Sequence, residues 1–130
     1  MPSASGEAPK VVLLVEDEPA IVQLLKHQVE MEGFAVMIAR NGADAVEAVS
    51  RAKLSVVLLD LGLPDMSGFE VLKNLHAMKP EIPVVMVTGV HVEEEARKAF
   101  ALGAWDYVTK PIDFTYLKNV LRVYSQQVSP

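Results

Sequence analysis

The segment that most constrains the fold is an apolar run that ends in a carboxylate. Residues Leu54 to Leu59 are apolar apart from Ser55, and Asp60 follows them directly. A strand without alternation between apolar and polar residues is typical of parallel sheets that are covered on both faces. Open α/β sheets bind their ligands at the carboxyl ends of such strands, so Asp60 is expected at a functional edge.

Strand and helix patterns alternate five times along the chain. The expected strands cover residues 11–15, 34–39, 55–59, 84–87 and 107–108. Residues that favour helix ends mark the helices between them: Pro19 in a first turn, Asn41, Ser67 and Asp113 as N-caps, and Gly33 and Gly103 at the C-terminal ends. One helix is expected over residues 92–102. Another helix is expected to run through Leu72, Leu75 and His76. The helix side chains expected to face the core are Ile21, Leu24, Leu25, Gln28, Val29, Ala45, Val46, Val49, Ala96, Ala99, Phe100, Phe114, Leu117, Val120, Leu121 and Tyr124.

This alternation determines the expected architecture. Strands that are joined by single helices run parallel, and their crossovers are right-handed. The sequence therefore predicts an α/β fold, a three-layer (βα)5 doubly wound parallel sheet with the flavodoxin-like strand order 2-1-3-4-5. In this order the second and fifth strands are the edges, and the switch point lies between the first and third strands, beside Asp17 and Asp60.

Size and composition exclude several classes of protein. The chain has 130 residues, 51% of them hydrophobic, which fits one domain with a proper core. Residues 1–9 are expected to form a disordered tail ahead of a domain over residues 10–127. The net charge of −5 offers no positive surface for nucleic acid or an anionic membrane, and the absence of cysteine excludes disulfides. No apolar stretch fits a signal peptide or a membrane span, so we expect a cytoplasmic protein.

Acidic residues follow two of the expected strands. Glu16 and Asp17 come after the first strand, and Asp60 comes after the third. Taken alone, Glu16 and Asp17 also fit surface carboxylates that stabilise a helix N-terminus. Three carboxylates in one crevice repel one another, and Mg²⁺, which prefers oxygen ligands, offsets that repulsion. Asp60 is also a candidate nucleophile, because a carboxylate can form an aspartyl phosphate.

A hydroxyl and an ammonium group follow the last two strands. Thr88 ends the fourth strand and precedes Gly89, and Lys110 follows the fifth strand and precedes Pro111. Each has an ordinary interpretation, since Thr is common in strands and Lys is common in solvated loops. At the carboxyl edge of a parallel sheet, however, both can contact the oxygens of a phosphoryl group.

Together with their flanking residues, these positions resemble the receiver domain of two-component response regulators, of the kind found in chemotaxis regulators. The resemblance covers the chain from about Lys10 to Tyr124. The matching stretches are Leu14-Val15-Glu16-Asp17-Glu18-Pro19, Leu59-Asp60-Leu61-Gly62-Leu63-Pro64, Ser67-Gly68-Phe69-Glu70, Val87-Thr88-Gly89 and Gly103-Ala104-Trp105-Asp106-Tyr107-Val108-Thr109-Lys110-Pro111.

The resemblance implies a metal-dependent phosphorylation. Asp60 would accept a phosphoryl group from the phosphohistidine of a sensor histidine kinase or of a histidine phosphotransfer protein, and the domain would catalyse its own phosphorylation and slow dephosphorylation. Asp17, the Asp60 side chain and the backbone carbonyl of Gly62 would bind Mg²⁺, with Glu16 acting through water. Glu16 departs from the family pattern, in which an Asp is more common at this position.

The resemblance also implies a switch. Thr88 and Lys110 would hold the phosphoryl group, and the Lys110–Pro111 peptide bond would be cis. Thr88 and Tyr107 would then change the face made by the fourth helix, the fifth strand and the fifth helix. That face would control an output domain or a partner protein, and a homodimer formed on phosphorylation is one such outcome.

Three other functions fit the same fold less well. A hydrolase of the haloacid dehalogenase type has a second Asp two residues after its nucleophile, where this chain has Gly62. A nucleotide- or flavin-binding module needs a Gly-rich loop after the first strand, where the residues here are Glu16-Asp17-Glu18. A receiver-like domain that binds partners without phosphate would not need the complete set of acidic residues, Thr88 and Lys110.

Overall fold

The computed structural model describes residues 8–89 and 93–126, and these contain five strands and five helices in strict alternation. Residues 1–7 of the expected tail, residue 92 of an expected helix and residue 127 of the expected domain lie outside this description. The elements are β1 (Val11–Val15), α1 (Pro19–Met31), β2 (Ala35–Ala39), α2 (Gly42–Arg51), β3 (Val56–Leu59), α3 (Gly68–Met78), β4 (Val84–Thr88), α4 (Glu93–Ala101), β5 (Asp106–Thr109) and α5 (Phe114–Tyr124).

All five strands belong to one parallel sheet in the order β2-β1-β3-β4-β5. The predicted α/β fold, its strand order and its two edge strands are therefore confirmed. β1 and β3 are neighbours, with Val15 opposite Leu59, and β4 and β5 are neighbours, with Thr88 opposite Thr109. This register aligns the carboxyl ends of the strands at one edge of the sheet.

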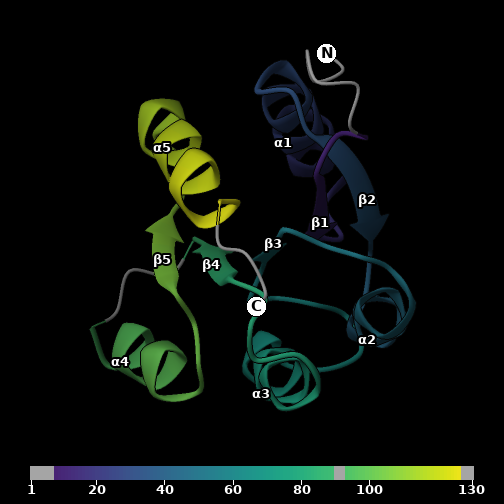
Figure 1. The fold of residues 1–130 in the computed structure, drawn as a ribbon. Coiled ribbons are helices and arrows are strands. Elements are labelled where there is room, and N and C mark those ends of the chain that lie inside the picture. The colour runs from purple at the N-terminus through teal and green to yellow at the C-terminus, as the bar shows by residue number, and fades with distance from the viewer. Residues whose placement is uncertain (1–7, 90–92, 127–130) are drawn as a thin grey trace.

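Helices cover both faces of this sheet. Figure 1 shows α1 and α5 over one face and α2, α3 and α4 over the other. Successive residues of β3 enter different cores: Val56 and Leu58 pack with α1 and α5, whereas Val57 and Leu59 pack with α2 and α3. All four β3 side chains are fully buried, which explains why this segment of the sequence is apolar without alternation.

The predicted helix ends are confirmed where the structure gives their geometry. Asn41, Ser67 and Asp113 each accept a hydrogen bond from a backbone N–H in the first turn of α2, α3 and α5, respectively. Gly33 and Gly103 follow α1 and α4 with φ angles of 92° and 110°, which favour glycine. Within the described ranges, none of the helices is both long and apolar enough to cross a membrane.

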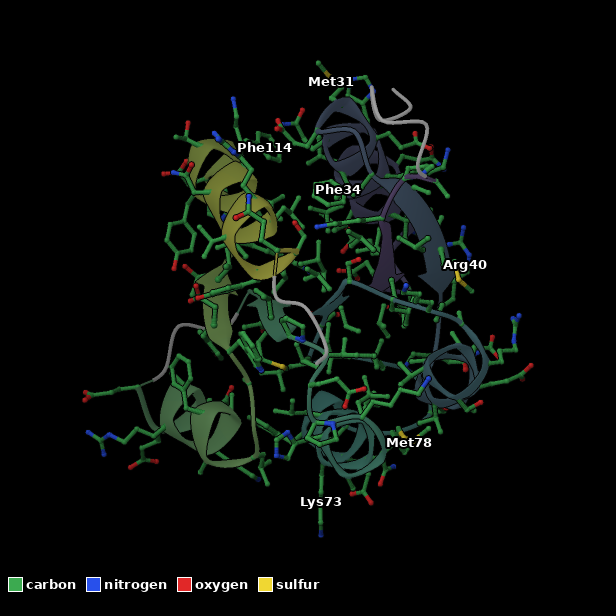
Figure 2. The ribbon with its side chains drawn as sticks, in the orientation of Figure 1. Met31, Phe34, Arg40, Lys73, Met78 and Phe114 are labelled. Carbon is green, nitrogen blue, oxygen red and sulfur yellow. The ribbon has the colours of Figure 1, made fainter. Side chains whose placement is uncertain are left out.

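Two predicted core positions are wrong. Leu24 and Phe100 were expected to face inward, but they are 44% and 49% exposed. The inward stripe of α1 consists of Val22, Leu25 and Val29, and Leu24 is rotated off that stripe by one residue. In α4 the inward position is occupied by Ala99, so that the adjacent Phe100 points outward. Other side chains on the outer sides of the helices also point away from the sheet, as Figure 2 shows for Met31 of α1 and Lys73 of α3.

The start of α3 packs closely against the end of β3. A Cβ atom on Gly68 would lie 2.6 Å from the carbonyl oxygen of Asp60 and 2.6 Å from the Cα atom of Leu61. Both contacts are with backbone atoms, which cannot move aside as the end of a side chain can. The backbone N–H of Gly68 also donates to the Leu61 carbonyl at 3.0 Å. A glycine at position 68 is therefore required for the loop between β3 and α3 to close.

We predict that Gly68→Ala lowers the free energy of unfolding by about 1–3 kcal/mol, because the added methyl group forces the backbone at Asp60 to move. Gly62→Ala is the matched control in the same loop. Its Cβ atom would lie 3.7 Å from Asp60 Oδ2, an ordinary contact, so the expected change is below about 0.5 kcal/mol. Urea unfolding of both variants measures the difference, and equal stabilities would show that the loop adapts to a side chain at position 68.

Candidate functional site

Three carboxylates meet at the carboxyl edge of the sheet. Glu16 and Asp17 follow β1, Asp60 follows β3, and one oxygen from each side chain lies within 4.8 Å of the others. The neighbouring strands bring them together: the backbone N–H of Asp60 donates to the carbonyl of Val15 at 3.0 Å. Glu16 and Asp60 are buried, and Asp17 is exposed. The predicted clustering of the acidic residues is confirmed.

Lys110 supplies a positive charge to this cluster. Its Nζ atom donates a hydrogen bond to Glu16 Oε1 at 3.0 Å and lies 3.6 Å from Asp60 Oδ1. The backbone N–H of Lys110 donates to the carbonyl of Thr88 at 2.8 Å, which fixes the residue at the end of β5. The Lys110–Pro111 peptide bond is cis, as the family resemblance implied. A single ammonium group thus contacts two of the three carboxylates.

Burial and charge act in opposite directions on Glu16 and Lys110. Burial raises the pKa of the Glu16 carboxyl, the charge of Asp60 raises it further, and the hydrogen bond from Lys110 offsets only part of this shift. Burial by itself would lower the pKa of the Lys110 ammonium. The hydrogen bond to Glu16 and the charges of Asp60, Glu16 and Glu18 outweigh burial, so that the pKa of Lys110 is raised.

Asp60 opens onto a pocket of about 340 Å³. Thr88 lies in its wall and is buried, so its hydroxyl-bearing side chain belongs to the same site as the Asp60 carboxylate. A Cβ atom on Gly89 would meet nothing within 4 Å, which leaves the space beside Thr88 open. The residues that line the pocket are Asp60, Leu61, Gly62, Ser67, Phe69, Thr88, Gly89 and Glu95.

The backbone of Gly62 lies beside the Asp60 carboxylate, since a Cβ atom at this position would be 3.7 Å from Asp60 Oδ2. Tyr107 lies farther back on β5, opposite Met86 of β4, and is half-buried against the core on the α2, α3 and α4 side of the sheet. Burial raises the pKa of the Tyr107 hydroxyl, and the charge of Glu95 adds to that shift. The structure therefore places Gly62 within the site and Tyr107 on the neighbouring strand.

Sequence reasoning missed two acidic residues near the site. In the run of glutamates at residues 93–95, Glu93 and Glu94 are exposed, but Glu95 is half-buried and lines the pocket. Asp65, in the loop after Asp60, received no role, yet its carboxylate accepts two backbone hydrogen bonds from α2. A run of three glutamates does not indicate which of them faces inward. The contact of Asp65 with α2 could not be predicted either, because Asp65 is far from α2 in the sequence.

The donor set fits a hard divalent cation. All three clustered side chains offer carboxylate oxygens, which are the ligands that Mg²⁺ prefers, and the exposed Asp17 leaves one side open to the water that Mg²⁺ retains. One lysine does not neutralise three carboxylates, so a cation would relieve the remaining repulsion.

Comparisons with known proteins agree on a single family. The chain matches the family model of the response regulator receiver domain over residues 12–122. It is 37% identical over 123 residues to the probable transcriptional regulatory protein TcrX of Mycobacterium tuberculosis, which covers 95% of this chain and 51% of TcrX. The chain spans about half the length of the curated relatives it matches.

Solved structures show the same architecture. A CheY-like response regulator receiver domain protein of Methanospirillum hungatei is similar with a TM-score of 0.86 and 30% identity, over 91% of this chain and 94% of that one. The receiver domain of the sensor histidine kinase PA1611 of Pseudomonas aeruginosa shares the fold with a TM-score of 0.84 and 23% identity, over 91% of this chain and 98% of that one. The latter was solved with a magnesium ion coordinated in its active site cleft.

We predict that Lys110→Met lowers the free energy of unfolding by about 3 kcal/mol at neutral pH, because it leaves the buried Glu16 carboxylate without its cation. The pKa of folded Glu16 already exceeds its ordinary value of 4.5 and rises further in the variant. As the pH falls, the folded protein therefore takes up a proton at Glu16 at a higher pH than the unfolded chain does. Protonation removes the unpaired buried charge, so lowering the pH towards 5 recovers stability. Urea unfolding across this pH range in the presence of EDTA measures the recovery.

Lys26→Met is the control for this prediction. Lys26 Nζ lies 3.5 Å from Glu30 Oε1 on α1, where the two side chains are 39% and 49% exposed to solvent, so the loss of this pair is expected to cost less than about 1 kcal/mol. A Lys110→Met variant that is as stable as Lys26→Met at pH 7, or whose deficit does not shrink with falling pH, would contradict the role given to the Lys110–Glu16 pair.

Proposed function

Because the chain belongs to the family of response regulator receiver domains, we propose that it is the phosphoacceptor domain of a two-component response regulator. In this proposal a carboxylate oxygen of Asp60 attacks the phosphorus atom of a phosphohistidine on a histidine kinase or a histidine phosphotransfer protein. The P–N bond breaks, its electron pair stays on the imidazole, and the phosphoryl group remains on Asp60. The observation that carries the proposal is the position of Asp60, inside the three-carboxylate cluster and 3.6 Å from Lys110 Nζ.

The acidic residues are proposed to hold Mg²⁺ during this step. Asp17, the Asp60 side chain and the Gly62 carbonyl would bind the ion directly, and Glu16 would act through water. When bound, Mg²⁺ would supply the positive charge that lets a phosphoryl dianion approach a carboxylate. Glu16 accepts hydrogen bonds from Lys110 Nζ and from the backbone N–H of Glu18, and these two bonds restrict the orientation of its carboxylate.

Thr88 and Lys110 are proposed to bind the transferred group. Lys110 already lies between Glu16 and Asp60, so its Nζ atom needs only a small movement to contact an oxygen on Asp60. The Thr88 side chain lines the pocket into which a group on Asp60 would extend. An ammonium and a hydroxyl donor on different strands can thereby stabilise the charge that develops on the phosphoryl oxygens.

We predict that acetyl phosphate adds the mass of one phosphoryl group to the protein only when Mg²⁺ is present, and that Asp60→Asn abolishes the addition. The amide of Asn is a poor nucleophile and a weak ligand for a cation, so the variant lacks both the nucleophile and a ligand for Mg²⁺. Mass spectrometry of the intact protein measures the labelling.

Asp113→Asn is the matched control for Asp60→Asn. It removes a carboxylate from the N-cap of α5, where an amide oxygen can still accept the two backbone hydrogen bonds, and it should be labelled as the wild type is. Labelling of Asp60→Asn at the wild-type rate, or of the wild type in EDTA, would exclude the mechanism.

Phosphorylation is further proposed to switch the face made by α4, β5 and α5. β4 and β5 are hydrogen-bonded neighbours, so a displacement of Thr88 towards the phosphoryl group bears directly on the strand that carries Tyr107. The face would then control an output domain or a partner protein, or support a homodimer. We propose a cytoplasmic location, where histidine kinases present their phosphohistidine, and no direct binding of nucleic acid by this domain, whose net charge is −5.

We predict that beryllofluoride with Mg²⁺ changes the backbone NMR shifts of residues 93–101 and of Tyr107, in addition to those of the loops around Asp60. The reason is that two packings of Tyr107 would exchange when Thr88 moves. Asp60→Asn treated in the same way is the control and should show no change. Shift changes confined to the loops that contact Asp60 would show that the site is not coupled to this face.

A further inference from the structure

The loop that follows Asp60 is bonded to a helix that is distant in sequence. In the β3–α3 loop (residues 60–67), Asp65 Oδ1 accepts a hydrogen bond from the backbone N–H of Gly42 at 2.7 Å, and Asp65 Oδ2 accepts one from Ala43 at 3.0 Å. These are the first two N–H groups of α2. The third, on Asp44, donates to Asn41 Oδ1 at 2.8 Å. The N-terminus of α2 is thus capped partly by its own neighbour and partly by the loop.

The contact is close because residue 42 is a glycine. A Cβ atom at Gly42 would lie 2.5 Å from Cγ of Met66 and 2.8 Å from a methyl group of Val71. The absence of a side chain allows residues 65 and 66 to reach the helix end. The hydrogen bond from Gly42 is the largest cause that lowers the pKa of the Asp65 carboxyl, and the bond from Ala43 acts in the same direction. At neutral pH the anion therefore caps the positive end of the α2 dipole.

The same loop carries Gly62, three residues before Asp65. Its C-terminal end is closed by the hydrogen bond from the Gly68 N–H to the Leu61 carbonyl at 3.0 Å. Asp65 adds a second attachment, which joins the outer part of the loop to α2 on the same side of the sheet. Between these two attachments the path of the backbone at Gly62, Leu63 and Pro64 is restricted.

We propose that Asp65 is a positioning residue for the metal-dependent reaction at Asp60: by bonding to the N-terminus of α2 it holds the loop in the conformation that directs the Gly62 carbonyl at the cation. The inference rests on the proposed function, because it assumes that Gly62 is a ligand. Groups that orient a ligand without touching the metal alter its affinity substantially. Asp65 would act in this way through the backbone rather than through a side chain.

The test compares the Mg²⁺ affinity of three variants with that of the wild type by calorimetric titration. Asp65→Ala removes both hydrogen bonds and should weaken Mg²⁺ binding roughly tenfold. Its phosphorylation by acetyl phosphate should be slow at limiting Mg²⁺ and return to nearly the wild-type rate at saturating Mg²⁺. Asp65→Asn loses the charge but keeps an oxygen that accepts one of the bonds, so its affinity should lie closer to that of the wild type than to that of Asp65→Ala.

Asp44→Ala is the matched control. It removes a carboxylate from the first turn of the same helix, where Asp44 contacts Asn41 but no residue of the loop, and its Mg²⁺ affinity should stay near the wild-type value. Urea unfolding shows whether each variant is folded at the titration temperature. Equal affinities for folded Asp65→Ala and Asp44→Ala would reduce Asp65 to a helix cap and overturn the inference. Equally weak binding by Asp65→Asn and Asp65→Ala would assign the effect to charge and overturn it as well.

Failure of the inference can be told apart from failure of the proposed function. If the wild type neither binds Mg²⁺ nor is phosphorylated in its presence, the proposed function itself is wrong. If the wild type does both and only the comparison among the Asp65 variants fails, then Asp60 chemistry stands and the loop is held in place by other contacts, such as that between Gly68 and Leu61.

Discussion

The close approach of three carboxylates dominates the electrostatics at the carboxyl edge of the sheet. At the ends of two adjacent strands, one carboxylate oxygen from each of Glu16, Asp17 and Asp60 lies within 4.8 Å of the other two. The ammonium group of Lys110 contacts the carboxylates of Glu16 and Asp60. Burial makes the cluster still less favourable, as the raised pKa of Glu16 indicates. Such a site is costly to form, and a bound divalent cation would offset that cost.

The stability that offsets this cost comes from the two cores. The side chains of β3 are fully buried and alternate between the core under α1 and α5 and the core under α2, α3 and α4, so the strand that ends at Asp60 is held from both faces. The helices are then attached close to the site: α3 starts against the Asp60 carbonyl at Gly68, and α2 is capped by Asp65. A rigid scaffold therefore surrounds a strained arrangement of charges, as precise positioning requires.

The paired strands β4 and β5 connect the site to Tyr107. Thr88 is the last residue of β4, and Lys110 directly follows β5, the strand that carries Tyr107. The backbone N–H of Lys110 donates a hydrogen bond to the carbonyl of Thr88. Glu95 lies both in the wall of the Asp60 pocket and close enough to Tyr107 to raise its pKa. Glu95 of α4 therefore lies between the Asp60 pocket and Tyr107 of β5.

The sequence alone was enough to predict the layout of the fold and the residues at its carboxyl edge, because a buried strand such as β3 needs a continuous apolar run and because Glu16, Asp60 and Lys110 each follow a strand directly. It also determined the helix ends, where Asn41, Ser67 and Asp113 act over two or three residues. The packing of the helices on the sheet turns Leu24 and Phe100 outward and Glu95 towards the pocket, and it brings Asp65 into hydrogen-bonding distance of α2. These outcomes depend on how the helices are rotated and on contacts across more than twenty residues of chain, which local patterns do not encode.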